Sequence, residues 1–180
     1  MPGPNIARGS ARDVPSLEPL WVDVHRHHAA SMPELAPYVT DAETWAERSA
    51  LYTELLAKPD TVLLLARLDG ALVGYGLSHV LDLAETWIPD TWRTGSRIVE
   101  LESLAVQPGH QGAGIGSALM DAIEREWAAL GVDDVIVGAL AGNAGAIRLY
   151  ERRGFRPTWL YLSRFAGRDG SAGPPSHPPP

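Results

Sequence analysis

Glycines at positions 112, 114 and 116 make the segment from Gln111 to Ser117 the part of the chain best suited to hold a ligand. An apolar segment that ends at Val106 enters this turn, and an amphipathic stretch leaves it. Glycine allows the backbone to approach a ligand closely and to point several N–H groups in one direction. A helix that begins here adds its unpaired N–H donors and the positive end of its dipole. The turn therefore predicts a site for a phosphate or pyrophosphate group, held by main-chain dipoles even in an acidic protein.

Two common nucleotide-binding motifs fit this turn poorly. A Walker loop ends in Gly-Lys-Ser/Thr, whereas the chain has Gly116-Ser117 without a lysine. A dinucleotide fingerprint has the spacing G-x-G-x-x-G and an acidic residue at the end of the next strand, about 20 residues on. Here the spacing is G-x-G-x-G, and the next predicted strand ends in Val-Gly-Ala at 137–139. From the glycines alone, a misread nucleotide-binding protein and a purely structural turn both stay open.

The spacing of apolar residues predicts the elements that must position this turn. Helices are predicted from Asp13 to about 28, from 41 to before 59, from about 114 to 130, and near 143–153. Strands are predicted at 6–8, 61–68, 71–80, 97–106, 134–138 and 158–164, with Asp69-Gly70 as a hairpin turn. The order of these elements predicts an α/β or α+β fold with a mixed sheet. One domain is expected over residues 1–166, followed by a disordered Gly- and Pro-rich tail at 167–180.

Composition excludes several classes of protein. The chain has 180 residues, 45% hydrophobic and 21% charged, and a net charge of −7. The negative charge argues against nucleic-acid binding, which needs an electropositive surface. The absence of cysteine excludes disulfides, cysteine zinc sites and a thiol nucleophile. No apolar run approaches the roughly 20 residues of a membrane span, and no secretory signal is recognisable, so a cytoplasmic location without membrane contact is expected.

Two blocks of the sequence resemble the GNAT superfamily of N-acetyltransferases. The pattern QxxGxG at 111–116, preceded by LAVQP at 104–108, looks like the coenzyme A signature of that family. The pattern NxxAxxLYxxxGF at 143–155 falls at the distance expected for a second family block. The resemblance covers about 98–164, whereas the earlier hairpin and helices agree only in their order.

This resemblance implies a central mixed sheet, splayed beside strand 97–106 and flanked by helices, with acetyl-CoA as co-substrate in the opening. The main chain at 104–106 would pair with the pantetheine arm, and the amides at 111–117 would hold the pyrophosphate. The last helix would place Asn143 against the coenzyme and Tyr150 near the thioester sulfur. The residues implied in coenzyme binding are Leu104, Ala105, Val106, Gln111, Gly112, Ala113, Gly114, Ile115, Gly116, Ser117, Asn143, Ala146 and Tyr150.

Transfer of an acetyl group from a thioester to an amine poses three chemical tasks. The amine must lose a proton, because an alkylammonium with a pKa of about 10.4 has no lone pair. The carbonyl oxygen becomes an oxyanion, for which a backbone N–H near Ala105 or Val106 is the expected donor. The leaving thiolate benefits from an acid, for which Tyr150 is the candidate.

Two carboxylates on the strand before the glycine turn are the candidates for the base. Glu102 is the first and Glu100 the second, and their spacing places both on one face of a strand if no bulge intervenes. Either would take the proton directly or through a water molecule. An electrostatic role, in which these acids attract a cationic acceptor or pair with Arg97, stays open.

The expected function is therefore an acetyl-CoA-dependent N-acetyltransferase that acts on a primary amine of a small molecule or protein by direct transfer in a ternary complex. A non-catalytic acyl-CoA sensor is the alternative, since it would need the turn but neither Tyr150 nor a strand carboxylate. The family often dimerises, so a homodimer stays open. No metal is expected, because the histidine-rich run at 25–28 has no carboxylate at a ligand spacing.

Overall fold

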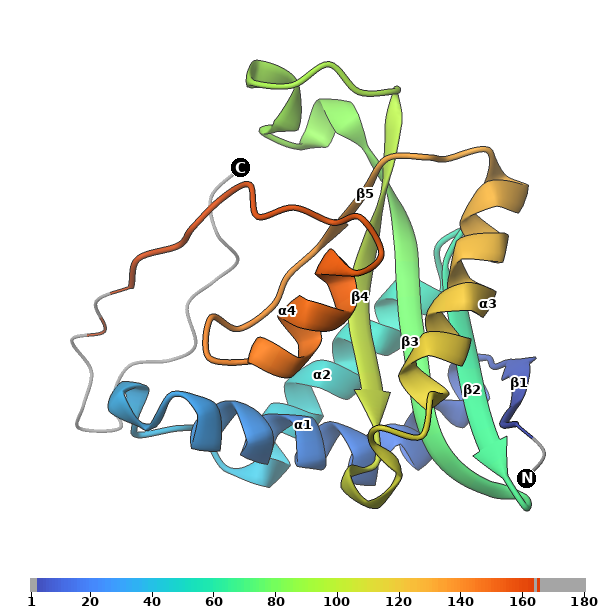
Figure 1. Ribbon diagram of the computed structural model, residues 1–180, viewed down its shortest axis with the longest axis vertical. Coiled ribbons are helices and arrows are strands. Elements are labelled where there is room, and N and C mark those ends of the chain that lie inside the picture. The colour runs from blue at the N-terminus through green and yellow to red at the C-terminus, as the bar shows by residue number, and fades with distance from the viewer. Residues whose placement is uncertain (1–2, 164, 166–180) are drawn as a thin grey trace.

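The computed structural model describes residues 3–163 and 165, and its five strands form one mixed sheet in the order β1-β2-β3-β4-β5 (Figure 1). The strands are β1 (Asn5–Arg8), β2 (Val62–Leu68), β3 (Ala71–Asp82), β4 (Arg97–Val106) and β5 (Val135–Val137). The three pairs from β1 to β4 are antiparallel, and β5 runs parallel to β4. The predicted mixed sheet and its flanking helices are confirmed.

Four α-helices cover the two faces of the sheet. They are α1 (Glu18–Ser31), α2 (Asp41–Leu56), α3 (Ile115–Leu130) and α4 (Ala144–Glu151). Short 3-10 helices lie at Ala11–Leu17, Pro33–Leu35, Leu83–Glu85, Ile88–Asp90 and Pro108–His110. Helices α1 and α2 pack on one face, and α3 and α4 lie on the other (Figure 1). In the described part of the chain, no helix has both the length and the apolarity needed to cross a membrane.

The first predicted helix differs in detail from the structure. The segment begins as a 3-10 helix capped by Ser10, and the α-helix starts only at Glu18. Pro19 lies in the first turn of α1, where its missing N–H costs nothing, so it favours a helix start at this point. By contrast, α2 begins where the sequence predicts, because Thr40 and Glu43 form a reciprocal capping box.

The apolar core lies in two layers, one on each face of the sheet. Residues Val62 to Ala66 of β2 are all buried, because helices cover the strand on both faces. Leu63 and Leu65 pack toward α1 and α2, whereas Val62, Leu64 and Ala66 pack toward α3. The amphipathic stretch after the glycine turn forms α3, and its buried side chains pack in the second layer: Ile115, Leu119, Met120, Ala122, Ile123 and Trp127. This packing fixes β3 and β4 between the two layers of helices.

Strands β4 and β5 separate after a short contact. They pair at three positions, from Val99 opposite Val135 to Leu101 opposite Val137. The chain then leaves the sheet and continues into α4, while β4 runs on to Val106. The edge of β4 beyond Leu101 therefore has no β5 residue beside it within the described chain. This is the splayed sheet that the resemblance implies.

The predicted last strand at 158–164 is wrong for its described residues. Residues 158–163 form neither strand nor helix, and Leu160, Tyr161 and Leu162 are exposed. A strand needs a partner, and residues 158–163 pair with no strand of the described sheet. Trp159 instead packs against Trp87, with ring centroids 4.9 Å apart. Arg164 and the predicted tail at 167–180 lie outside the described residues.

Candidate active site

A β-bulge interrupts β4 at Glu102. Leu77 of β3 lies opposite Ser103, but the next residue, Ser78, lies opposite Leu101. Glu102 is therefore the extra residue of the bulge. As a result, the consecutive residues Glu102 and Ser103 both contact side chains of α2, on the same face of the sheet.

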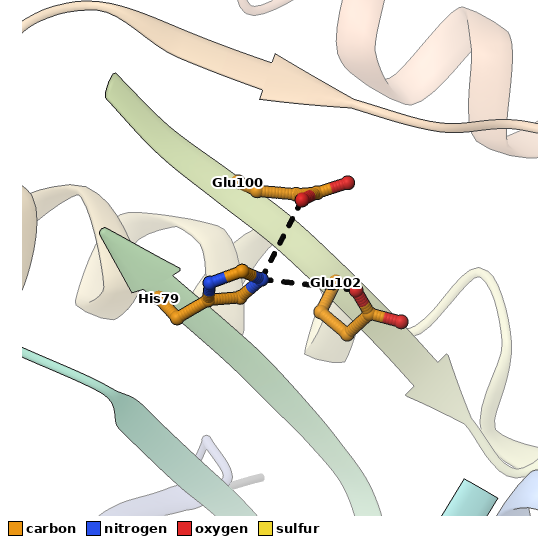
Figure 2. A group of neighbouring side chains, drawn as sticks. All are labelled: His79, Glu100 and Glu102. Atoms are coloured by element: carbon orange, nitrogen blue, oxygen red, sulfur yellow. Dashed lines mark ion pairs between the residues drawn. The ribbon is translucent and has the colours of Figure 1, made fainter. Parts of the chain in front are cut away.

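The bulge brings the two predicted carboxylates to one histidine. His79 of β3 lies directly opposite Glu100, and its Nε2 atom faces the carboxylates of both Glu100 and Glu102 (Figure 2). The His79 Nε2 atom is 3.5 Å from Glu100 Oε2 and 3.8 Å from Glu102 Oε2. These separations are ion pairs rather than tight hydrogen bonds. The expectation that Glu100 and Glu102 share a face is correct, although a bulge does intervene.

The environment of His79 favours its protonated form. Burial by itself would lower the pKa of His79, but the adjacent carboxylates of Glu100 and Glu102 outweigh it and raise this pKa to about 9. The pKa of Glu102 is lowered, because His79 and Arg48 together overcome the effect of its burial. Glu100 is the more accessible carboxylate, with 33% of its side chain exposed against 17% for Glu102.

Arg48 of α2 is the second cation of this cluster. It forms an ion pair with Glu102, and its guanidinium carbon lies 3.9 Å from the centroid of the Trp21 ring. With His79 protonated, two positive and two negative charges balance. Sequence reasoning did not find Arg48, because it lies 54 positions before its partner and belongs to no motif.

The same three side chains also have the composition of a metal-ligand set. One ligand atom from each of His79, Glu100 and Glu102 lies within 4.8 Å of the other two. Among the described residues, these three form the cluster of histidine and acidic side chains that could hold a metal ion. Protonated His79 and Arg48 already neutralise both carboxylates, so the cluster needs no metal for charge balance. The predicted absence of a metal stays a prediction. His25, from the histidine run, instead makes a hydrogen bond with the Val39 carbonyl.

The glycine turn has the backbone geometry that anion binding needs. Gly112 and Gly114 have φ values of +77° and +83°, in the left-handed region that favours glycine. Gly114 is the N-cap of α3, and the first turn of that helix contains no acidic side chain. Residues 111–114 and Ser117 are exposed, whereas Ile115 is buried and Gly116 partly buried, so most of this turn is open to solvent. The first N–H groups of a helix have no partner within the helix.

The end of β4 lies against this turn. The Gln111 side chain donates a hydrogen bond to the Val106 carbonyl at 3.3 Å. A Cβ atom at Gly116 would lie 3.7 Å from Val106 and 3.8 Å from Leu149 of α4. Three predicted parts of the site, the end of β4, the turn and α4, therefore meet at one place.

Helix α4 holds the remaining predicted residues. Asn143 caps it by accepting a hydrogen bond from the Ala146 N–H at 3.1 Å. Tyr150 is 7% exposed, belongs to the apolar layer under α3 and α4, and has its pKa raised by burial to about 12. Tyr150 and the carboxylates therefore approach β4 from opposite faces of the sheet. The structure places Glu100 and Glu102 together beside His79, and places the glycine turn beside the end of β4 and α4. It shows no contact between Tyr150 and Glu100 or Glu102.

The arrangement agrees with a comparison of the sequence with known families. Residues 21–155, most of the chain, match the acetyltransferase (GNAT) family. The chain belongs to the GNAT family. Solved GNAT proteins share the fold: a GCN5-related N-acetyltransferase from Ralstonia eutropha JMP134 superposes with a TM-score of 0.71 at 20% identity, covering 92% of this chain and 100% of that one.

Curated relatives of this GNAT chain carry different names. An uncharacterized N-acetyltransferase of Mycobacterium tuberculosis H37Rv is 33% identical over 60% of this chain and 61% of its own length. A mycothiol acetyltransferase of Beutenbergia cavernae is 34% identical over 80% of this chain and 43% of its own length. An IAA acetyltransferase of Azospirillum brasilense is 30% identical over 68% of this chain and 72% of its own length. This chain thus spans about three fifths of the Mycobacterium relative and less than half of the mycothiol acetyltransferase.

Proposed function

We propose that this chain transfers an acetyl group from acetyl-CoA to a primary amine, by direct attack in a ternary complex. The observation that carries the proposal is the separation of β4 from β5 after Leu101. This open edge of β4 lies between the exposed glycine turn and the carboxylates of Glu100 and Glu102. A thioester placed along the open edge of β4 would have the turn at one end and Glu100 at the other. Family membership supports acetyl-CoA as the donor.

The glycine turn is proposed to bind the pyrophosphate of the coenzyme. Main-chain N–H groups of residues 111–117 would donate to its oxygens, and the dipole of α3 would favour the negative charge. The unpaired edge at 104–106 would pair with the amides of the pantetheine arm. Asn143 and Ala146, which are already joined by the cap of α4, would border the coenzyme from the other side.

Glu100 is proposed as the group that meets the acceptor amine. Glu102 was the first candidate from the sequence, but Arg48 and His79 both engage its carboxylate and keep its pKa low. Glu100 is the more exposed and, of the two cations, contacts only His79. It would receive the ammonium proton directly or through a water molecule, which leaves the nitrogen lone pair free to attack.

Tyr150 is proposed as the acid for the leaving group. The amine nitrogen forms the new C–N bond to the acetyl carbon and loses its second proton to solvent, while the C–S bond breaks. The Tyr150 hydroxyl protonates the coenzyme A sulfur and then regains a proton from solvent. With a pKa of about 12, this hydroxyl stays neutral and keeps its proton at physiological pH. A backbone N–H just after the bulge, at Ala105 or Val106, would stabilise the oxyanion.

The experiment for this proposal is an acetylation assay that measures release of free coenzyme A with a panel of amines. The panel should contain polyamines, amino sugars, amino acids and a peptide with a free N-terminus. Turnover with at least one amine supports acetyl transfer to an amine, and the absence of a stoichiometric burst of coenzyme A without an acceptor supports direct transfer over an acetyl-enzyme. Tight binding of acetyl-CoA without turnover on any amine would favour the acyl-CoA sensor. The cytoplasmic location and the homodimer expected from the sequence stay predictions.

A further inference from the structure

Two side chains of α2, one helical turn apart, contact the two consecutive residues of the bulge. Arg48 forms its ion pair with Glu102, and the Tyr52 hydroxyl donates a hydrogen bond to Ser103 Oγ at 2.6 Å. Residues four apart on a helix point the same way, so one face of α2 reaches both positions. Contacts to two adjacent strand residues from one helix are possible only because the bulge turns both of them toward α2.

Each of these side chains is itself held by neighbours. The guanidinium of Arg48 stacks on Trp21 of α1, and the Trp21 indole N–H donates to Thr44 Oγ1 at 3.0 Å. Tyr52 is fully buried, and its oxygen lies 2.9 Å from the hydroxyl oxygen of Tyr75. Because Tyr52 uses its O–H to bind Ser103, Tyr75 donates to Tyr52. Tyr52 thereby joins α2 to both β3 and β4.

A bulge without such contacts has alternatives close in energy. Moving the extra residue by one position along β4 changes the face on which Glu102 or Ser103 lies. Such a move would carry a carboxylate away from His79 or turn Ser103 away from Tyr52. The paired contacts from α2 favour one position of the bulge over its neighbours.

We infer that Arg48 and Tyr52 are positioning residues for acetyl transfer, which fix the bulge of β4 so that Glu100 and the N–H groups after Ser103 face the acceptor and the thioester. The inference rests on the proposed function. Neither residue needs to touch a substrate. Their effect on catalysis would pass entirely through the geometry of β4 between residues 100 and 106.

The test compares Arg48→Met, Arg48→Lys and Tyr52→Phe with the control Glu47→Gln, an exposed neighbour on α2. Tyr52→Phe keeps the buried ring and removes only the hydroxyl that binds Ser103. It therefore still tests the inference if Arg48→Met does not fold. Each protein is assayed for kcat, for the KM of acetyl-CoA, for the pH dependence of kcat/KM, and for hydrogen–deuterium exchange of peptides covering 97–106 and 115–130.

The inference predicts that Arg48→Met lowers kcat by about 10- to 100-fold, as a displaced catalytic group does, with the KM for acetyl-CoA changed by no more than about twofold. Loss of the Arg48 charge should also raise the pKa of His79, because His79 then faces an excess of negative charge, so any fall in kcat/KM that follows deprotonation of His79 should move to higher pH. Arg48→Lys should recover part of the rate. In both Arg48→Met and Tyr52→Phe, exchange should increase in 97–106 but not in 115–130.

Folded variants with unchanged kcat, or with unchanged exchange in 97–106, would overturn the inference. The exchange measurement needs no acceptor. If the unmodified protein acetylates no amine, the proposed function fails, while exchange still decides whether α2 fixes the bulge.

Discussion

His79 of β3 and Glu100 of β4 lie directly opposite each other, with Nε2 and the carboxylate 3.5 Å apart. The candidate base Glu100 therefore also affects the free energy of unfolding, because its carboxylate helps to raise the pKa of His79. The raised pKa of His79, about 9, means that the folded chain holds a proton that the unfolded chain releases at a lower pH.

The first prediction concerns stability against pH. A histidine whose pKa rises on folding contributes stability that is full below its ordinary value near 6.5 and is lost as pH rises through about 9. The melting temperature should therefore fall between these pH values. In His79→Gln this fall should be smaller, because no proton is bound at that position. An identical pH dependence in both proteins would show that His79 is not protonated between the carboxylates.

The second prediction separates the two carboxylates. Glu100→Gln should lower kcat by about 100-fold or more, the usual effect of losing a general base. It should lower the melting temperature only moderately, because protonated His79 keeps its second carboxylate, Glu102. Glu102→Gln removes the negative charge that pairs with both Arg48 and His79 in a largely buried cluster. It should therefore lower the melting temperature more than Glu100→Gln does. Steady-state kinetics and thermal denaturation of both variants check this. A larger loss of kcat in Glu102→Gln, with its melting temperature unchanged, would assign the base to Glu102.

The third prediction concerns Tyr150. Tyr150→Phe keeps the buried ring and removes the hydroxyl, so acetyl-CoA should bind with nearly the same Kd while kcat falls by about 100-fold. Calorimetry and the coenzyme A release assay measure the two quantities. Unchanged turnover would leave Tyr150 as a core residue packed against Phe155.

The fourth prediction tests the glycine turn against a matched glycine elsewhere. Gly114 and Gly70 have φ values of +83° and +85°, and a Cβ at either meets no atom within 4 Å. Alanine at each position should cost about 1–2 kcal/mol of stability, since an L-residue is strained in this region. Only Gly114→Ala should also weaken acetyl-CoA binding, because Gly70 lies in the β2–β3 hairpin turn. Equal Kd values for the two variants would remove the turn from the binding site.

Local sequence signals were sufficient for the elements and for the glycine turn. The predicted start of the helix at 41, the hairpin signal Asp69-Gly70 and the glycines at 112 and 114 depend on neighbouring residues. The structure has α2 begin at Asp41, the hairpin at Asp69-Gly70 and positive φ values at both glycines. The segment 158–163 shows the limit of such signals, because its apolar pattern favours a strand but no strand of the described sheet lies beside it.

The core of the candidate site depends on contacts between distant residues. Arg48 and Tyr52 lie 54 and 51 positions before Glu102 and Ser103, and neither belongs to a recognisable motif. The bulge itself leaves no mark in the sequence, because the run from Glu100 to Ser103 is compatible with a regular strand. Only the pairing of β3 with β4 shows that Glu102 is the extra residue.

A crystal structure of the protein with acetyl-CoA tests the central claim most directly. The account predicts the pyrophosphate on the main-chain N–H groups of 111–117, the pantetheine arm along the open edge of β4 at 104–106, and the thioester between Glu100 and Tyr150. A coenzyme bound elsewhere, or a saturated crystal in which residues 111–117 contact no phosphate, would contradict it.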